Sequence, residues 1–95
     1  MIIKTIAEFQ TALDNGPYAW PGGYPVYFIT QDGAALSFDA VKLEQEEIKQ
    51  AIIDQDLHSD WRVIGLDINW EDASLYCDHT GKRIESAYAE EEVAL

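Results

Sequence analysis

Apolar residues near the start of the chain recur at three- and four-residue intervals, the spacing of one helix face: Ile6, Phe9 and Leu13. Thr5 and Glu8 form the T-x-x-E pattern of a capping box, which satisfies the free backbone N–H groups at a helix start. Gly16 followed by Pro17 is typical of a helix end. The pattern therefore predicts a helix between Thr5 and Gly16.

The next pattern is that of a hairpin. Residues 17–25 contain three prolines and two glycines, so we expect no regular structure there. Residues 24–30 are rich in aromatic and β-branched side chains, which predicts a strand. Asp32-Gly33 is a strong hairpin-turn sequence, and residues 34–38 form the predicted returning strand.

A second helix is predicted over residues 39–55, with Ser37 as its cap. Its apolar positions share one face: Val41, Ile48 and Ile52. Residues 61–68 then predict a strand, and Asn69 is placed to cap a short turn. Residues 75–77 lead into a tight turn at 78–81, with Ile84 on the far arm, which predicts a second hairpin.

Together these elements predict a small α+β fold in one domain. The expected order is helix, β-hairpin, helix and second β-hairpin, followed by an acidic C-terminal tail. We assign residues 1–88 to the domain and expect the acidic tail, residues 89–95, to fray. A chain of 95 residues supplies one modest hydrophobic core.

The negative charge of the chain limits the classes of partner that it is expected to bind. Eighteen acids oppose six bases, which gives a formal net charge of -12. Direct binding to nucleic acid is not expected, because phosphate neutralisation needs clustered Lys and Arg, and anionic membranes are disfavoured for the same reason. Electrostatics favours another protein with a basic surface, such as one that normally holds nucleic acid.

Cysteine usage and hydropathy indicate a cytoplasmic protein. Cys77 is the single cysteine in the sequence, which leaves no internal disulfide. Residues 1–4 lack the pattern of a secretory signal, and no apolar run is long enough for a membrane span.

Two pairs of residues have the spacing of metal-ligand pairs but lack most of the ligands, as in a degenerate metal site. Zinc ribbons hold their ion in two C-x-x-C knuckles, each in a tight turn. Cys77 and Thr80 have this spacing in the predicted turn at 78–81, with threonine in the second place. Ser37 and Ala40 have the same spacing after the first hairpin, where the other knuckle would lie. Hydroxyl and methyl groups are not zinc ligands, so we expect neither a bound metal nor any other cofactor.

Two longer segments carry a resemblance. The first is W-P-G-G-Y-P at residues 20–25, and the second runs from N-W-E-D at residue 69 through L-Y-C-D at residue 75 to S-A-Y at residue 86. In these segments the chain resembles a family of short, mostly uncharacterised proteins encoded by proteobacteria and bacteriophages. Some relatives have cysteine pairs where this chain has Ser37/Ala40 and Cys77/Thr80. The resemblance implies a metal-free, degenerate zinc-ribbon-like branch, and it implies no activity.

Cys77 and His79 also invite interpretation as a nucleophile and its base. A catalytic cysteine needs a base within hydrogen-bond reach and a third group to orient that base. No oxyanion-hole motif accompanies the pair. We therefore rank an enzyme third among the functions, and the simpler interpretation of Cys77 is a small buried hydrophobic residue.

The aromatic loop has two interpretations. Tyr18, Trp20 and Tyr24 on a glycine-hinged loop are typical of partner anchors, and equally of a lid over a small core. Because turn-forming residues adjoin Trp20 and Trp70, both tryptophans are predicted to lie in the core.

The acids of the second predicted helix supply the most specific functional hypothesis. Glu44, Glu46 and Glu47 lie largely away from its apolar face. Such a surface either keeps the protein soluble or imitates phosphates and occupies a basic groove, as in anti-restriction and anti-CRISPR proteins. We expect a non-catalytic protein-binding module, with the acidic inhibitor as its most concrete form. The alternative is a metal-free zinc-ribbon-like accessory domain.

Overall fold

The computed structural model describes residues 1–19, 22–55 and 59–88, so Trp20 and the predicted tail 89–95 lie outside the described residues. The fold is α+β, as predicted. Its elements in chain order are α1 (Ile6–Asp14), β1 (Tyr18–Ala19), β2 (Tyr24–Thr30), β3 (Ala35–Ser37), α2 (Phe38–Leu43), α3 (Gln45–Asp54) and β4 (Val63–Ile68).

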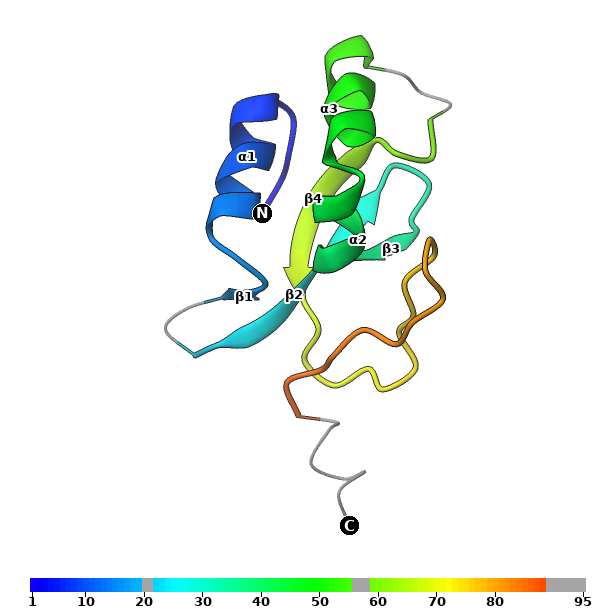
Figure 1. Ribbon diagram of the computed structural model, residues 1–95. Coiled ribbons are helices and arrows are strands. Elements are labelled where there is room, and N and C mark those ends of the chain that lie inside the picture. Colours follow the sequence, from blue (N-terminus) through cyan, green and yellow to red (C-terminus); the bar gives the residue numbers. More distant parts are fainter. Residues whose placement is uncertain (20–21, 56–58, 89–95) are drawn as a thin grey trace.

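The antiparallel sheet is built around β2, which pairs with β3 in one register and with β4 in another (Figure 1). β1 pairs with the start of β2, opposite Tyr24 and Pro25. This short strand corrects the expectation of no regular structure in residues 17–25. Val26 can still donate its N–H to the Pro17 carbonyl, at 3.1 Å, so a proline at the strand start does not prevent pairing.

Two local predictions are confirmed by their hydrogen bonds. In the capping box of α1, Glu8 N–H donates to Thr5 Oγ1 at 3.2 Å and Thr5 N–H donates to Glu8 Oε1 at 3.1 Å. In the β2–β3 turn, Gly33 has φ +85, a value that favours glycine.

The helix predicted over residues 39–55 is two helices, which is a correction. Glu44 ends α2 and precedes α3, with φ -104 and ψ 23. Val41 and Ile48 both remain fully buried on either side of the break. The apolar spacing is thus the same for one helix and for two, so it could not reveal the break. No helix in the described ranges combines the length and the apolarity needed to cross a membrane.

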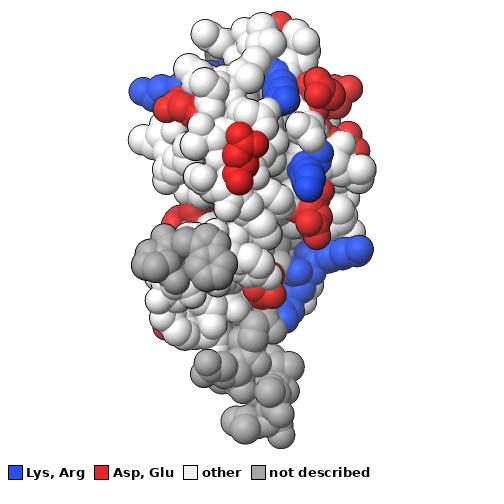
Figure 2. Space-filling view, turned by 60° about the vertical axis from the view of Figure 1, so that its left-hand side comes forward, with Lys and Arg blue, Asp and Glu red and all other residues white. Residues whose placement is uncertain are grey.

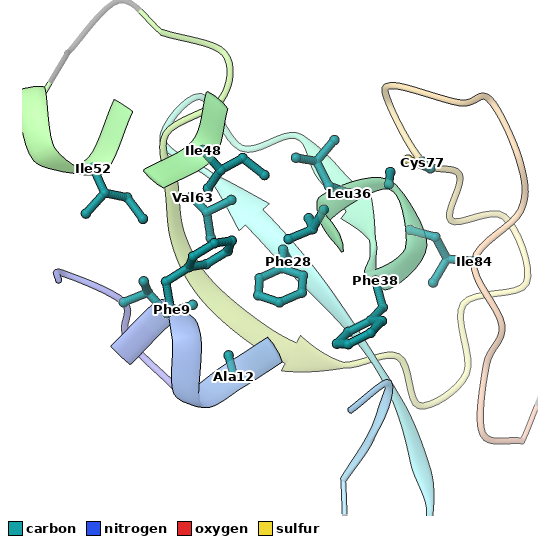
Figure 3. Close-up of a cluster of buried hydrophobic side chains, with 13 residues drawn as sticks. Phe9, Ala12, Phe28, Leu36, Phe38, Ile48, Ile52, Val63, Cys77 and Ile84 are labelled. Carbon is teal, nitrogen blue, oxygen red and sulfur yellow. The ribbon is translucent and has the colours of Figure 1, made fainter. Parts of the chain in front are cut away.

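The core lies between the sheet and the helices (Figures 1 and 3). The ring of Phe28 from β2 lies 5.9 Å from that of Phe9 on α1 and 6.2 Å from that of Phe38 on α2, measured between centroids. Cys77 and Ile84 extend this core toward the C-terminal part of the chain (Figure 3).

Residues 69–88 follow β4 without a further helix or named strand. The predicted second hairpin is reduced to an isolated antiparallel bridge between Tyr76 and Arg83. The loop is attached to β3, because Asp78 N–H donates to the Ala35 carbonyl at 2.8 Å. The predicted strand at 61–68 is shorter, Val63–Ile68, and it pairs with β2 rather than with this hairpin.

Candidate functional site

A buried asparagine joins three segments at the end of β4. Asn69 is 3% exposed. Its backbone N–H donates to the Pro25 carbonyl at 3.0 Å, and its own carbonyl accepts from Ala87 N–H at 2.8 Å. Its Nδ2 donates to the carbonyls of Asp72 and Glu85, each at 3.1 Å, and its Oδ1 accepts from Asp72 N–H at 3.2 Å. One side chain therefore caps the turn after β4, as predicted, and also fixes the C-terminal part of the described chain.

Three aromatic side chains meet where Asn69 joins these segments, and we call Tyr24, Trp70 and Tyr88 the aromatic cluster. The ring centroids of Tyr24 and Trp70 are 4.6 Å apart. Trp70 and Tyr88 are stacked at 6.0 Å with an interplanar angle of 12°. These separations leave no room for a ligand between the rings, so the accessible surfaces are their outer faces.

The aromatic cluster is exposed yet held in place. Trp70 is 44% exposed and Tyr88 47% exposed. Tyr88 N–H donates to the Trp70 carbonyl at 2.9 Å, which fixes the two residues side by side. Gly22 packs so closely on the Tyr24 ring that a Cβ there would lie 2.0 Å from a ring carbon. The cluster is therefore a preassembled surface feature.

The exposure of Trp70 makes the prediction that it belongs to the core wrong. Trp70 follows the end of β4, and the ring contacts that hold it come from Tyr24 and Tyr88 rather than from the helices. Trp20, the other tryptophan predicted to be buried, lies outside the described residues.

The predicted aromatic loop is divided by the strand pairing. Tyr18 pairs with Pro25, and Ala19 pairs with Tyr24, so Tyr18 and Tyr24 lie on opposite faces of the ribbon. The Tyr18 hydroxyl donates to Glu85 Oε1 at 3.5 Å, and the negative charge of Glu85 raises the pKa of Tyr18. Tyr24 alone of these two joins the aromatic cluster.

The acids predicted to bind a partner lie apart from these aromatic residues. Glu44, Glu46 and Glu47 lie at the α2–α3 junction and in the first turn of α3, whereas β1 and the start of β2 lie below and to the left of that junction in Figure 1. Glu44 is half-buried, with its Oε1 3.8 Å from His79 Nε2. Glu46 and Glu47 are exposed.

Carboxylates are distributed over the described surface. All the described Asp and Glu residues are exposed except Glu8 and Glu44, which are half-buried. On the face in Figure 2, acidic side chains are scattered among uncharged ones, and the basic side chains lie mainly along its right-hand side. On this face the acids therefore form no continuous patch, and their combined effect is a long-range negative potential.

The four positions of the degenerate knuckle site, Ser37, Ala40, Cys77 and Thr80, are brought together. Ser37 N–H donates to Cys77 Sγ at 3.3 Å, and Ala40 N–H donates to Ser37 Oγ at 3.2 Å. Ser37, Ala40 and Thr80 line one hollow of about 240 Å³. Gly81 closes the Cys77–Thr80 turn with φ +73, and its N–H donates to the Cys77 carbonyl at 2.8 Å.

The donor set at this site does not fit zinc. It offers one thiol, two hydroxyl groups and a methyl group, whereas a structural zinc ion takes about four thiolate or imidazole ligands. In the described ranges no three His, Cys, Asp or Glu side chains gather closely enough to hold a metal ion. His79, two residues from Cys77, lies beside Glu44 and edge-on to Trp61, with ring centroids 4.9 Å apart.

Cys77 is buried, as its simpler interpretation predicted, but its thiol is acidic. Burial raises its pKa, while hydrogen bonds from Ser37 and Thr80 lower it, and the net result is a pKa of about 7 against an ordinary 9.0. At 1% exposure the sulfur is out of reach of a substrate. Since His79 contacts Glu44 and Trp61, the geometry does not support a nucleophile–base pair.

The acidic thiol predicts a pH-dependent stability. Because the pKa of Cys77 is lower in the folded state, the thiolate form stabilises the fold, and this stabilisation is complete at pH values above the pKa of the unfolded state. The stabilisation is lost as the pH falls through the folded-state pKa of about 7. Urea unfolding should therefore show that Cys77→Ala costs about 1–3 kcal/mol more at about pH 9.5 than at about pH 6. Thr80→Val, which removes one donor, should reduce this pH dependence. A cost for Cys77→Ala that is equal at both pH values would contradict the prediction.

Sequence reasoning missed the aromatic cluster and the central role of Asn69. Trp70 and Tyr88 both fall within the long segment that carries the family resemblance, and Tyr24 falls within the short one. Their spatial meeting depends on Asn69 bonding to Pro25 and Ala87, which are far from each other in sequence. The two segments that carry the resemblance contain all three aromatic residues, but they do not indicate that these residues contact one another.

Comparison with known proteins does not identify a family for this chain. Comparison of the chain with protein-family models, with curated proteins and with solved structures finds no match. The resemblance to short proteobacterial and bacteriophage proteins therefore stays a prediction. What can be said of function comes from the surface and from the two clusters described above.

Proposed function

We propose that the protein is a non-catalytic protein-binding module that inhibits a nucleic-acid-handling protein by binding its basic surface. The observation that carries the proposal is the excess of exposed carboxylates in a chain of net charge -12. A basic groove that has evolved to attract phosphates also attracts this surface. Anti-restriction and anti-CRISPR proteins are the functional class that fits best.

The distribution of the charges supports steering over long distances. Acids lie on α2, α3, β4 and the loop that follows it, so the negative potential surrounds much of the described molecule. Charges of this kind mainly accelerate association, and their reach in salt is about 8–10 Å. A second kind of contact must then hold the complex once it has formed.

The proposal predicts the nature of a captured partner and its response to salt. The partner isolated from a bacterial lysate at low salt should be basic, and its own DNA or RNA should displace the acidic protein. Affinity should fall at least about tenfold between roughly 0.05 M and 0.3 M salt, because screening shortens the reach of exposed charges. A neutral or acidic partner whose binding ignores salt and nucleic acid would overturn the proposal.

Paired variants of the helices supply a matched control. Glu46→Gln with Glu47→Gln should slow association with the captured partner, whereas Lys42→Gln with Lys49→Gln should accelerate it. Glu44 is left unchanged, because it contacts His79. Equal association rates for both pairs would show that these charges serve only solubility.

The degenerate knuckle site favours a second candidate function, a metal-free zinc-ribbon-like accessory domain. Its supporting observation is that Ser37, Ala40 and Thr80 line the same hollow while Ser37 N–H donates to Cys77 Sγ. On this proposal the hydrogen bonds and the buried thiol have taken over the structural role of an ion. The cysteine variant described in the Discussion tests it.

A further inference from the structure

The aromatic cluster offers the short-range contact that scattered surface charges lack. Trp70 and Tyr88 present large, half-exposed rings in a fixed arrangement. We propose that the aromatic cluster is the docking site for an arginine side chain of the basic partner, an inference that rests on the function proposed above. The guanidinium would stack on the outer face of Trp70.

The charge around the cluster selects a cationic occupant. Residues 5–41 and 63–81, which supply Tyr24 and Trp70, contain no Lys or Arg. Lys82 and Arg83, in the segment that supplies Tyr88, line the hollow at Ser37 and Thr80. Glu71 and Asp72 follow Trp70 directly, and both are exposed. The Asn69 side chain bonds to both the N–H and the carbonyl of Asp72, which fixes the main chain of this acid in the turn that carries Trp70. Carboxylates placed beside ring faces attract a cation and repel the phosphates of a nucleic acid.

The shape of the cluster favours arginine over lysine. A guanidinium is planar and weakly hydrated, so it stacks on an aromatic face while its N–H groups remain free to bond a carboxylate. An ammonium group is compact and strongly hydrated, which makes stacking on an open surface less favourable. Basic surfaces that hold nucleic acid are also rich in arginine, in agreement with the proposed partner.

The cluster is also preorganised, which lowers the entropic cost of binding. Asn69 fixes the backbones around Trp70 and Tyr88, and Gly22 lets the Tyr24 ring pack against Trp70. Rings that are already held in place lose little freedom when a partner docks. Such rigid aromatic residues are typical of interface hot spots.

Two peptides of equal length and charge test the proposal on the intact protein. One peptide repeats Arg-Gly and the other repeats Lys-Gly, and binding is followed by the indole and backbone N–H signals of the ¹⁵N-labelled chain. The Arg-Gly peptide should bind about two- to fivefold more tightly than the Lys-Gly peptide, and its largest shifts should fall at Trp70 and Tyr88.

Three variants locate the effect. Trp70→Leu should remove the preference for Arg-Gly, while Tyr76→Leu should keep it, because Tyr76 is 55% exposed but stands outside the cluster. Gly22→Ala should weaken the preference by displacing the Tyr24 ring, which keeps the proposal testable if Trp70→Leu fails to fold. The melting temperature of each variant shows whether it is folded.

The outcomes separate this inference from the proposed function. Equal binding of both peptides, with shifts centred on Glu46 and Glu47, would overturn arginine docking at the cluster and leave the acidic module standing. Tighter binding of a neutral, apolar peptide at Trp70 would overturn the choice of arginine. If neither basic peptide binds at low salt, both proposals fail.

Discussion

Replacing Ser37, Ala40 and Thr80 together with cysteine is expected to create a protein that binds one zinc ion in a tetrahedral site. Cys77 supplies the fourth thiolate. A structural zinc site of this kind is worth about 10–16 kcal/mol of apparent binding free energy near neutral pH, the largest effect expected for any change in this chain. Elemental analysis and cobalt substitution spectra, recorded under reducing conditions, measure the ion and its geometry.

The expectation rests on backbone geometry that is already present. Ser37 N–H donates to Cys77 Sγ at 3.3 Å, so the two chain segments are close enough to share one ion. The turn from Cys77 to Gly81 has the tight form that a knuckle needs, with φ +73 at the glycine. Ser37 caps α2 and Ala40 lies in the first turn of that helix, so thiolates at these two positions are also three residues apart and can point at the centre that the Cys77–Thr80 turn faces.

Two controls decide between a restored site and scattered cysteine binding. The same triple variant with Cys77→Ala should bind zinc far more weakly, since it loses the central ligand. The unaltered protein should hold no stoichiometric zinc, and a chelator should leave its melting temperature unchanged. Failure of the triple variant to bind zinc while it remains folded would contradict the zinc-ribbon-like interpretation.

Asn69→Ala should be the most damaging single polar substitution in the described chain, at about 2–4 kcal/mol of unfolding free energy. The change leaves the Asp72 N–H and the carbonyls of Asp72 and Glu85 without their side-chain partner. Urea unfolding measures the cost. Because the same bonds hold Trp70 and Tyr88, tryptophan fluorescence should also shift toward the solvent-exposed value.

A matched asparagine separates this clamp from a general effect of the substitution. Asn15 ends α1 and is exposed, so Asn15→Ala should cost less than about 0.5 kcal/mol. Asn69→Asp keeps the Oδ acceptor for Asp72 N–H but places a negative charge against the carbonyls of Asp72, Ile84 and Glu85, so it should be nearly as damaging as alanine. A cost below about 0.5 kcal/mol for Asn69→Ala would show that backbone bonds alone hold the turn.

The elements that sequence reasoning predicted well are those with local causes. The capping box of α1 needs Thr5 and Glu8 alone, and the β2–β3 turn needs Asp32 and Gly33. Ser37 likewise caps a helix through its own neighbour Ala40, at 3.2 Å. In each case the interacting groups are within four residues of one another, so the pattern contains the whole interaction.

The candidate sites were predictable only in part. Spacing indicated that Ser37, Ala40, Cys77 and Thr80 are related, because a knuckle has a fixed local form. The break at Glu44 went undetected, since Val41 and Ile48 keep the same register in one helix or two. Trp70 was misplaced because adjoining turn residues do not tell whether a ring points to the helices or to solvent.

The sequence by itself determined the α+β composition, the net negative charge and the lack of zinc-ligating groups at Ser37, Ala40 and Thr80, because these follow from residue identity and short-range bonds. Tertiary structure alone decided that β4 pairs with β2, that Asn69 joins Pro25 to Ala87, and that Tyr24, Trp70 and Tyr88 meet at the surface. Each of these contacts links residues far apart in the chain. Bringing such distant residues together costs chain entropy, and packing of the whole core offsets that cost. A local sequence pattern therefore does not show which distant residues will meet.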